Sequence, residues 1–338
     1  MNFTYSALPM RVVFGAGSLD SLPGEISFLK LEKVLVLCGP RQEAVGVAVA
    51  EALGDRCAGL LPEATMHVPA EVAAKARRVA AELGADGCVA VGGGSAIGLG
   101  KAVALEHGLP VVAVPTTYAG SEMTPVWGLT ENGVKRTGRD PKVLPVSVVY
   151  DPALTLTMPV SLAVTSGINA IAHAAEGLYA PDASPIVSLM ARDGVRALIT
   201  ALPAIVEHPD DLDARAEALY GAWLCGAVLG ATTMGLHHKL CHALGGTLNL
   251  PHSSTHTVVL PHVLAYNRVT EIAPVELWEL EGRLGAPRSL RELGMAADDI
   301  DRIAGQVASA TFPNPRPVTV PGVRDLLRAA WAGTPPAV

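Results

Sequence analysis

The chain has 338 residues, enough for one large or two ordinary domains, and its composition of 50% hydrophobic and 17% charged residues excludes a disordered chain. A formal net charge of −7 and the lack of any Lys/Arg-rich run exclude a nucleic-acid-binding surface. We expect no membrane partner and a cytoplasmic location, because no apolar run reaches the roughly 20 residues that span a bilayer and the first residues do not follow a secretory signal pattern.

Residues 1–155 alternate short apolar strands with helical segments, which is typical of a parallel sheet with helices on both faces. They predict an α/β, Rossmann-like dinucleotide-binding domain. Strands are expected at 33–37, 57–61, 87–91 and 110–114, and helices at 43–53, 70–83 and from the glycine-rich turn after residue 91 to about 107.

The turn that follows the third of these strands is VGGGSAIGLG, from Val91 to Gly100. Gly92, Gly93 and Gly94 let the backbone approach a ligand closely, and Ser95 is expected to cap the next helix. Bare amides at a helix N-terminus form a cradle for a pyrophosphate. The turn is not the G-x-G-x-x-G fingerprint, and a tight strand-to-helix turn without a ligand stays open as an alternative.

The next strand ends in a loop rich in hydroxyl groups, and ligands of open α/β sheets bind at such carboxyl ends. A polar loop that bonds only to itself is the alternative. The loop residues that we assign to the cofactor are Thr116, Thr117, Tyr118 and Ser121.

The first strand ends in Gly39, Pro40 and Arg41, without the carboxylate that accepts from an adenosine ribose and repels a 2′-phosphate. The cofactor is therefore NADH or NADPH, and this strand does not exclude either.

Residues 156–338 are predicted to form an all-helical domain that carries the catalytic residues. Long periodic apolar runs cover 160–179, 185–208 and 212–234, and a shorter helix is expected over 323–331.

Six of the ten histidines lie between Met234 and His262. His238 and His242 are four residues apart, as are His252 and His256, which places each pair on one face of a helix. Upstream, Asn169 and His173 have the same spacing. Such a density of imidazoles indicates proton transfer, anion binding or metal ligation, although any single histidine could be a buried structural residue.

These motifs together resemble the iron-containing alcohol dehydrogenase superfamily over essentially the whole chain. The resemblance rests on the GGGS turn, PTTYAGSE, GINAIAHAAE and the histidine run with its Pro251–His252 pair. The stretches TYAGSEMTPVWGLTE, GLHHKLCHALGG and NPRPV resemble the maleylacetate reductase branch.

In the metal-using members an Asp and three histidines hold the ion, and the matching positions here are Asn169, His173, His238 and His252. The resemblance implies a degenerate ligand set, because an amide oxygen is a poorer ligand than a carboxylate for a hard divalent cation. We therefore expect no catalytic metal. A metal-dependent alcohol or aldehyde dehydrogenase is the alternative, with occupancy through the three imidazoles.

The resemblance implies NADH- or NADPH-dependent reduction of the C=C bond of maleylacetate, a small dicarboxylate, to 3-oxoadipate in the breakdown of aromatic compounds, by a homodimer. His242 or His252 is expected to donate the proton or stabilise the enolate. Lys239 would anchor a carboxylate or lie in solvent, and Asn169 would bond to the substrate or hold His173.

Other polar residues are given more ordinary roles. Asp20 and Glu122 are expected at the surface or in caps, and His67 is expected to be structural rather than to line the cofactor site. Arg316 would contact substrate or fasten the C-terminal segment. A non-catalytic dicarboxylate-binding protein and a zinc-binding helical module are weaker alternatives, because neither needs a dinucleotide cradle.

Overall fold

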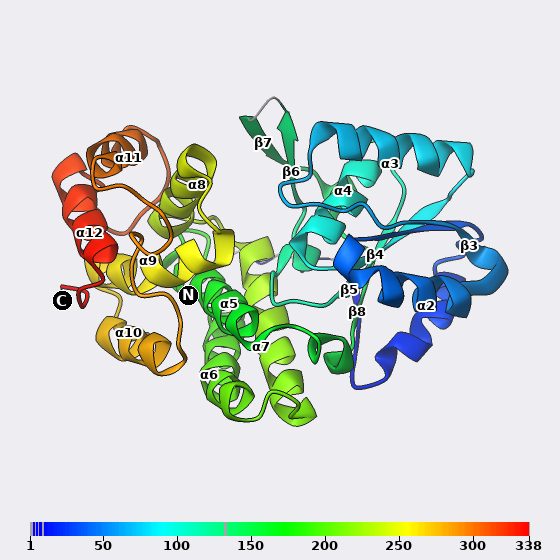
Figure 1. The fold of residues 1–338 in the computed structure, drawn as a ribbon, viewed down its shortest axis with the longest axis horizontal. Coiled ribbons are helices and arrows are strands. Elements are labelled where there is room, and N and C mark those ends of the chain that lie inside the picture. Colours follow the sequence, from blue (N-terminus) through cyan, green and yellow to red (C-terminus); the bar gives the residue numbers. More distant parts are fainter. Residues whose placement is uncertain (1–2, 4, 6, 9, 132–133, 338) are drawn as a thin grey trace. The chain divides into compact units, whose positions relative to one another are not determined.

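The computed structural model describes residues 3, 5, 7, 8, 10–131 and 134–337 (Figure 1). The chain divides into two compact units. The first, here called the sheet unit, runs from Ala7 to Met158 and includes Asp210–Leu219; the second, the helical unit, contains Pro159–Pro209 and the chain from Tyr220 onward. We had placed the boundary at 155, and the contribution of Asp210–Leu219 to the sheet unit was not predicted.

The sheet unit is built on a six-stranded sheet in which every neighbouring pair is parallel. In spatial order its strands are β1 (Arg11–Phe14), β8 (Ser147–Tyr150), β5 (Val111–Pro115), β4 (Gly87–Gly92), β2 (Val34–Cys38) and β3 (Cys57–Leu61). The helices beside it are α1 (Leu22–Phe28), α2 (Glu43–Leu53), α3 (Ala70–Glu82) and α4 (Gly94–His107). Short 3-10 turns lie at Ser18–Ser21, Pro40–Gln42, Gly54–Arg56, Ser121–Met123, Pro141–Val143 and Pro152–Thr155.

The side chains of successive strand residues point to opposite faces of this sheet, because a β-strand repeats every two residues. On one face Val89, Val91 and Val112 join a core with Ile26 of α1 and Val49 of α2. On the other face α4 lies so close to the sheet that a Cβ at Gly100 would stand 3.2 Å from both Ala90 and Val111. Since both faces are covered, the central strands are continuous apolar runs.

The order of the strands reverses between β2 and β4. The chain passes from β2 through α2 to β3 at one edge, returns through α3 to β4, and continues through α4 to β5 on the other side. Ligands of doubly wound sheets bind at such a reversal, outside the carboxyl ends of the strands. The predicted parallel sheet and its glycine-bearing strand end are confirmed. β1, β8 and the antiparallel hairpin of β6 (Val126–Glu131) and β7 (Val134–Arg139) were not predicted.

The helical unit contains α5 (Val160–Tyr179), α6 (Pro185–Glu207), most of α7 (Leu212–Ala231), α8 (Leu236–Leu248), α9 (His252–Asn267), α10 (Pro274–Arg283), α11 (Asp299–Ala308) and α12 (Val320–Ala332). One core joins Leu240 and Leu244 of α8, Val259 and Val263 of α9, and Leu327 of α12. The predicted all-helical character is confirmed, and the helices that carry the histidines are packed at its centre.

Within the described part of the chain, no single helix has the length and apolarity needed to cross a membrane. One bent pair, α7 with α8, meets that test of length and composition only when its two helices are taken together.

Candidate active site

The glycine-rich turn joins β4 to α4 at the strand-order reversal. Gly92 has a φ of +142°, a conformation that side chains rarely adopt. A Cβ at Gly93 would stand 2.9 Å from Oγ1 of Thr117, so only glycine permits this close approach of the two loops. The N-cap of α4 is Gly93 without a side-chain bond, and Ser95 lies inside the helix, so the prediction that Ser95 caps α4 was wrong. The first-turn amides of α4 therefore remain free of a side-chain cap and can face an anion.

The hydroxyl-bearing loop follows β5, which pairs directly with β4. The amide of Thr116 donates to the carbonyl of Gly92 at 3.1 Å, so the two strand ends are fastened together as the sequence predicted. Thr117 is partly exposed beside Gly93. The Tyr118 side chain, however, is fully buried, and the guanidinium of Arg215 lies within its electrostatic range. Tyr118 is therefore a packing residue of the sheet unit, and its assignment to the cofactor is not supported by its position.

A buried lysine fixes the far end of this loop. The ammonium of Lys101 on α4 donates to the carbonyls of Ser121, Thr124 and Val126 at 2.6–2.8 Å. Lys101 is fully buried, and its bonds hold the Ser121–Met123 turn against the helix. Sequence reasoning missed Lys101, although a charged residue in the otherwise apolar run IGLGKAVAL is a signal.

Glu122 was expected at the surface or in a cap, and that prediction was wrong. Its carboxyl is completely buried and accepts from the hydroxyl of Tyr150 at 2.9 Å. Burial raises the pKa of Glu122, and the bond from Tyr150 and the charge of Lys101 only partly oppose this. Asp20 is exposed, as expected.

At the end of β2, Gly39 precedes the Pro40–Gln42 turn. A Cβ at Gly39 would stand 3.2 Å from the carbonyl of Ala64, so this strand end is also closely packed. His67 adopts a left-handed conformation, and its carbonyl accepts from Thr130 at 2.9 Å. These contacts agree with the structural role expected for His67.

The second group of candidate residues lies in the helical unit, on three helices. The spacing of four places Asn169 and His173 on one face of α5, and His238 and His242 on one face of α8, while His252 begins α9. Ring centroids lie 5.2 Å apart for His173 and His238, 6.2 Å for His238 and His242, and 6.3 Å for His242 and His252. The structure thus brings the sequence-predicted residues together.

Burial divides this set into an inner and an outer part. Asn169, His173 and His238 are buried, whereas His242 and His252 are exposed. Burial, and then the neighbouring imidazoles, hold the pKa of His173 well below its ordinary value. His173 is therefore neutral near pH 7, where it can accept or donate a hydrogen bond but cannot supply a positive charge.

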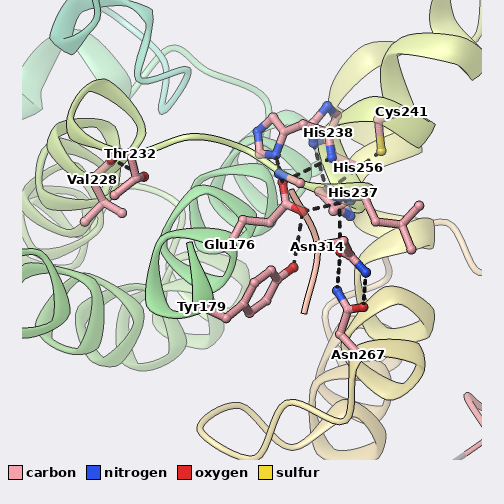
Figure 2. Close-up of polar contacts among 12 residues, drawn as sticks. Glu176, Tyr179, Val228, Thr232, His237, His238, Cys241, His256, Asn267 and Asn314 are labelled. Atoms are coloured by element: carbon pink, nitrogen blue, oxygen red, sulfur yellow. Dashed lines mark hydrogen bonds and ion pairs between the residues drawn. The ribbon is translucent and has the colours of Figure 1, made fainter. Parts of the chain in front are cut away.

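Figure 2 shows Glu176 of α5 at the first turn of α8. This fully buried carboxylate accepts from the backbone amides of Gly235, His237 and His238 and from Nδ1 of His238 at 2.6 Å (Figure 2). The hydroxyl of Tyr179 also donates to it, at 3.2 Å. Burial alone would raise the pKa of Glu176, but the bonds and charges from His238 and His237 lower it to about 2.

An ionised Glu176 determines which nitrogen of His238 carries the proton. Nδ1 must be the donor to the carboxylate, so Nε2 is the nitrogen left for other partners. Sequence reasoning missed Glu176, although an acid three residues after His173, in a run of Ala and Gly, is a recognisable signal of a buried partner.

A metal ion of the iron-containing family can be tested against these residues. The buried atoms Asn169 Oδ1, His173 Nδ1 and His238 Nε2 have no hydrogen-bond partner among the described residues. These three ligand atoms include no carboxylate oxygen, and the nearby carboxylate of Glu176 is already engaged with His238 and backbone amides. A hard divalent ion prefers an anionic oxygen ligand, so the amide at Asn169 makes the set a poor fit for iron. It fits a hydrogen-bonding organic ligand.

Two further candidates lie at the edge of this group. Lys239 is exposed on α8, on a different face from His238. Arg316 donates to the carbonyl of Tyr266 at 2.9 Å and lies over its ring. Arg316 thus fastens the C-terminal segment, one of the two roles that we had considered for it.

Comparison with known proteins gives the family of this fold and site. Residues 9–152 match the model of the iron-containing alcohol dehydrogenases, and residues 163–277 match the C-terminal model of the same family. The chain therefore belongs to the iron-containing alcohol dehydrogenase family, and it is an oxidoreductase.

Within that family, the chain is similar to maleylacetate reductases. It is 53% identical to the maleylacetate reductase of Burkholderia cepacia, over 99% of both chains. The crystal structure of maleylacetate reductase from Agrobacterium tumefaciens is 49% identical with a TM-score of 0.96, covering 99% of this chain and 100% of that one. An iron-containing alcohol dehydrogenase from Corynebacterium glutamicum is 43% identical with a TM-score of 0.93, covering 98% and 97%.

Proposed function

We propose that this protein reduces the C=C bond of maleylacetate with NADH or NADPH and forms 3-oxoadipate. The observation that carries the proposal is the buried set of Asn169, His173 and His238, with an amide in place of a carboxylate, in a chain about half identical to maleylacetate reductases. A set of hydrogen-bonding side chains suits an enone, whose reduction passes through an enolate rather than an alkoxide.

The reaction adds one hydride and one proton across the C=C bond. The nicotinamide delivers a hydride to the carbon β to the ketone, and the electron pair of the double bond moves to the ketone oxygen as an enolate. A proton then adds to the other carbon of the former double bond, which is bonded directly to the ketone carbon. The products are 3-oxoadipate and the oxidised nucleotide, and the net proton comes from an acid of the protein.

The exposed rings of His242 and His252 are suited to supply that proton, because they can exchange protons with solvent between turnovers. The amide NH₂ of Asn169 can donate to the enolate or to a carboxylate of the substrate, whereas Nε2 of His238 accepts a hydrogen bond when Nδ1 carries the proton. His173 is neutral, so it acts as a hydrogen-bonding group. Lys239 is proposed as a carboxylate anchor, which its exposed position permits.

The nucleotide is proposed to bind to the sheet unit, with its pyrophosphate on Gly92–Gly94 and the first turn of α4. Support comes from the left-handed Gly92 and from the contact of Gly93 with Thr117, which keep side chains away from these amides. The lack of a carboxylate after β2 leaves room for a 2′-phosphate.

The test is a spectrophotometric assay that follows the oxidation of NADH and of NADPH in the presence of maleylacetate. Consumption of either nucleotide is expected, with product identified as 3-oxoadipate by mass spectrometry. Folded protein that binds a nicotinamide nucleotide and leaves maleylacetate unchanged would refute the proposal. A homodimer and a dicarboxylate partner remain predictions.

A metal-dependent alcohol or aldehyde dehydrogenase is the second candidate. The observation in its favour is that His238 is oriented by a carboxylate, as metal-ligating histidines are. Metal analysis of protein purified without chelator separates the two proposals. One tightly held ion per chain, together with oxidation of simple alcohols, would favour this alternative.

A further inference from the structure

A second group of possible metal ligands, His237, Cys241 and His256, lies next to the imidazole rings assigned to catalysis. His237 and Cys241 are four residues apart on α8, and His256 comes from α9, so their side chains meet where the two helices pack (Figure 2). All three are buried, and their ligand atoms lie within 4.8 Å of one another. Sequence reasoning did not pair these residues.

Two of the three separations between these atoms are close to those of a tetrahedral zinc site, and the third is within 4.8 Å. Nε2 of His237 lies 3.0 Å from Nδ1 of His256 and 3.8 Å from Sγ of Cys241. Bonds of about 2.0–2.1 Å to nitrogen and 2.3 Å to sulfur place tetrahedral ligands roughly 3.4 Å apart for two nitrogens and 3.6 Å for nitrogen and sulfur. The two rings need only separate by a few tenths of an ångström to admit an ion.

The proton shared by the rings of His237 and His256 has another ring nitrogen to which it can move when an ion binds. In the ion-free state one proton lies between His237 Nε2 and His256 Nδ1, so one of the two outer nitrogens is bare. These outer nitrogens, His237 Nδ1 and His256 Nε2, are buried without a hydrogen-bond partner in the part of the chain that the structure describes. When an ion binds, the shared proton moves to the bare outer nitrogen, and Cys241 releases its thiol proton to solvent.

The charge of such a complex is compensated locally. A divalent ion with one thiolate carries a net charge of +1, which is costly in a buried place unless it is paired. The carboxylate of Glu176 accepts from the amide of His237 at 2.8 Å. Without an ion, burial and then the charge of Glu176 raise the pKa of the Cys241 thiol well above its ordinary value, so the thiolate forms only together with the bound ion. The sum of ion, thiolate and carboxylate is zero.

We propose that His237, Cys241 and His256 form a site for a thiophilic divalent cation such as Zn²⁺, separate from Asn169 and His173, and that its occupancy inhibits the enzyme. The ring of His256 lies 4.4 Å from that of His252 and 5.0 Å from that of His238. Admitting an ion moves the rings of His237 and His256 apart, so it displaces the ring of His256 against the neighbouring rings of His252 and His238. This second part rests on the proposed function.

The test uses Co²⁺ as a spectroscopic substitute for Zn²⁺ on the full chain, freed of metal and kept anaerobic. Thiolate ligation gives a near-ultraviolet charge-transfer band that nitrogen and oxygen ligands do not give. We expect one Co²⁺ per chain with this band, displaced by stoichiometric Zn²⁺ because zinc binds more tightly.

Matched variants identify the ligands. Cys241→Ala is expected to remove the band, while Cys57→Ala, at a half-buried thiol far along the sequence, and His173→Ala are expected to keep it. Cobalt binding without the band, a band that survives in C241A, or folded wild-type protein that binds no cobalt would each overturn the site. The spectra need no substrate, so this result stands apart from the reductase assay.

Inhibition is then measured with maleylacetate. Zn²⁺ is expected to reduce turnover at least tenfold in the wild type and in C57A, and less than twofold in C241A. Equal inhibition of C241A would overturn the inhibitory role while the cobalt spectra still decide whether the site exists.

Discussion

The replacement Glu176→Gln is expected to loosen the first turn of α8. Oε1 of Glu176 accepts from the amide of His237 and the hydroxyl of Tyr179, and Oε2 accepts from the amides of Gly235 and His238 and from Nδ1 of His238. A carboxamide has one acceptor oxygen. If that oxygen takes the place of Oε2, the NH₂ group faces the amide of His237, and a buried donor loses its partner.

The expected magnitude follows from these contacts. An orphaned buried donor costs about 1–3 kcal/mol, and the bonds that remain lose the strength that the charge gave them. We expect the local opening free energy to fall by about 3 kcal/mol, which corresponds to roughly 100-fold faster amide exchange at 1.4 kcal/mol per tenfold.

Hydrogen exchange followed by mass spectrometry measures this in peptides that cover Gly235 to Leu240. Tyr179→Phe is the matched control, because it removes one hydroxyl donor from the same carboxylate. Its effect should stay at about 1 kcal/mol, or less than tenfold. Exchange in E176Q within threefold of the wild type, with helix content retained, would refute the reasoning that Glu176 holds this turn.

The remaining predictions concern the site and the two units. Asn169→Asp should raise the affinity for Zn²⁺ or Fe²⁺, because it adds an anionic oxygen ligand; unchanged uptake in a chelator competition would contradict this. Truncating His242 or His252 to Ala should slow maleylacetate reduction by about 10²–10⁴, and a loss under tenfold in both would exclude them as proton donors. Lys101→Met removes the buried amine that donates to three carbonyls, of which that of Thr124 is buried, so it should destabilise the sheet unit by about 3 kcal/mol and weaken quenching of nicotinamide fluorescence on binding. Burial, and then a nearby Arg, lower the pKa of His262 to about 4; the unfolded chain therefore binds a proton at this residue below about pH 6.5 that the folded chain does not, and His262 should contribute a fall in the unfolding free energy of about 1.4 kcal/mol per pH unit from 6.5 to 4, in addition to that from the other buried histidines. Urea unfolding at pH 5 and 7 checks this, and His262→Gln with an undiminished loss would speak against it.

Local patterns explain the successes of the sequence analysis. The run at 34–38 is apolar because both faces of its strand are covered, while Gly92 supplies a φ of +142° and Gly93 a close approach to Thr117. The spacing of His238 and His242, and of Asn169 and His173, fixes a shared helix face, because a helix repeats every 3.6 residues. The resemblance then supplied the family, which the comparisons confirmed.

The errors concern polar residues whose partners are distant in the sequence. In the stretch TYAGSEM, Glu122 was predicted to be a surface or capping acid. In the structure it is buried and accepts a hydrogen bond from Tyr150 of β8. Tyr118 was predicted to contact the cofactor. In the structure its ring is buried, and the charge of Arg215, almost a hundred residues later in the sequence, affects the pKa of its hydroxyl. Ser95 reads as a cap, yet α4 begins one residue earlier, at Gly94.

By itself the sequence determined the α/β-then-helical order of the chain, the glycine turn, the helix faces that carry the imidazoles and the exchange of an acid for Asn169. Only the tertiary structure decided that Glu176 fixes the proton of His238, that Lys101 holds the hydroxyl loop, and that His237, Cys241 and His256 meet. The physical reason is that periodicity and turn chemistry act over a few neighbouring residues, whereas a buried charge or donor is stabilised only by partners that folding brings from far along the chain.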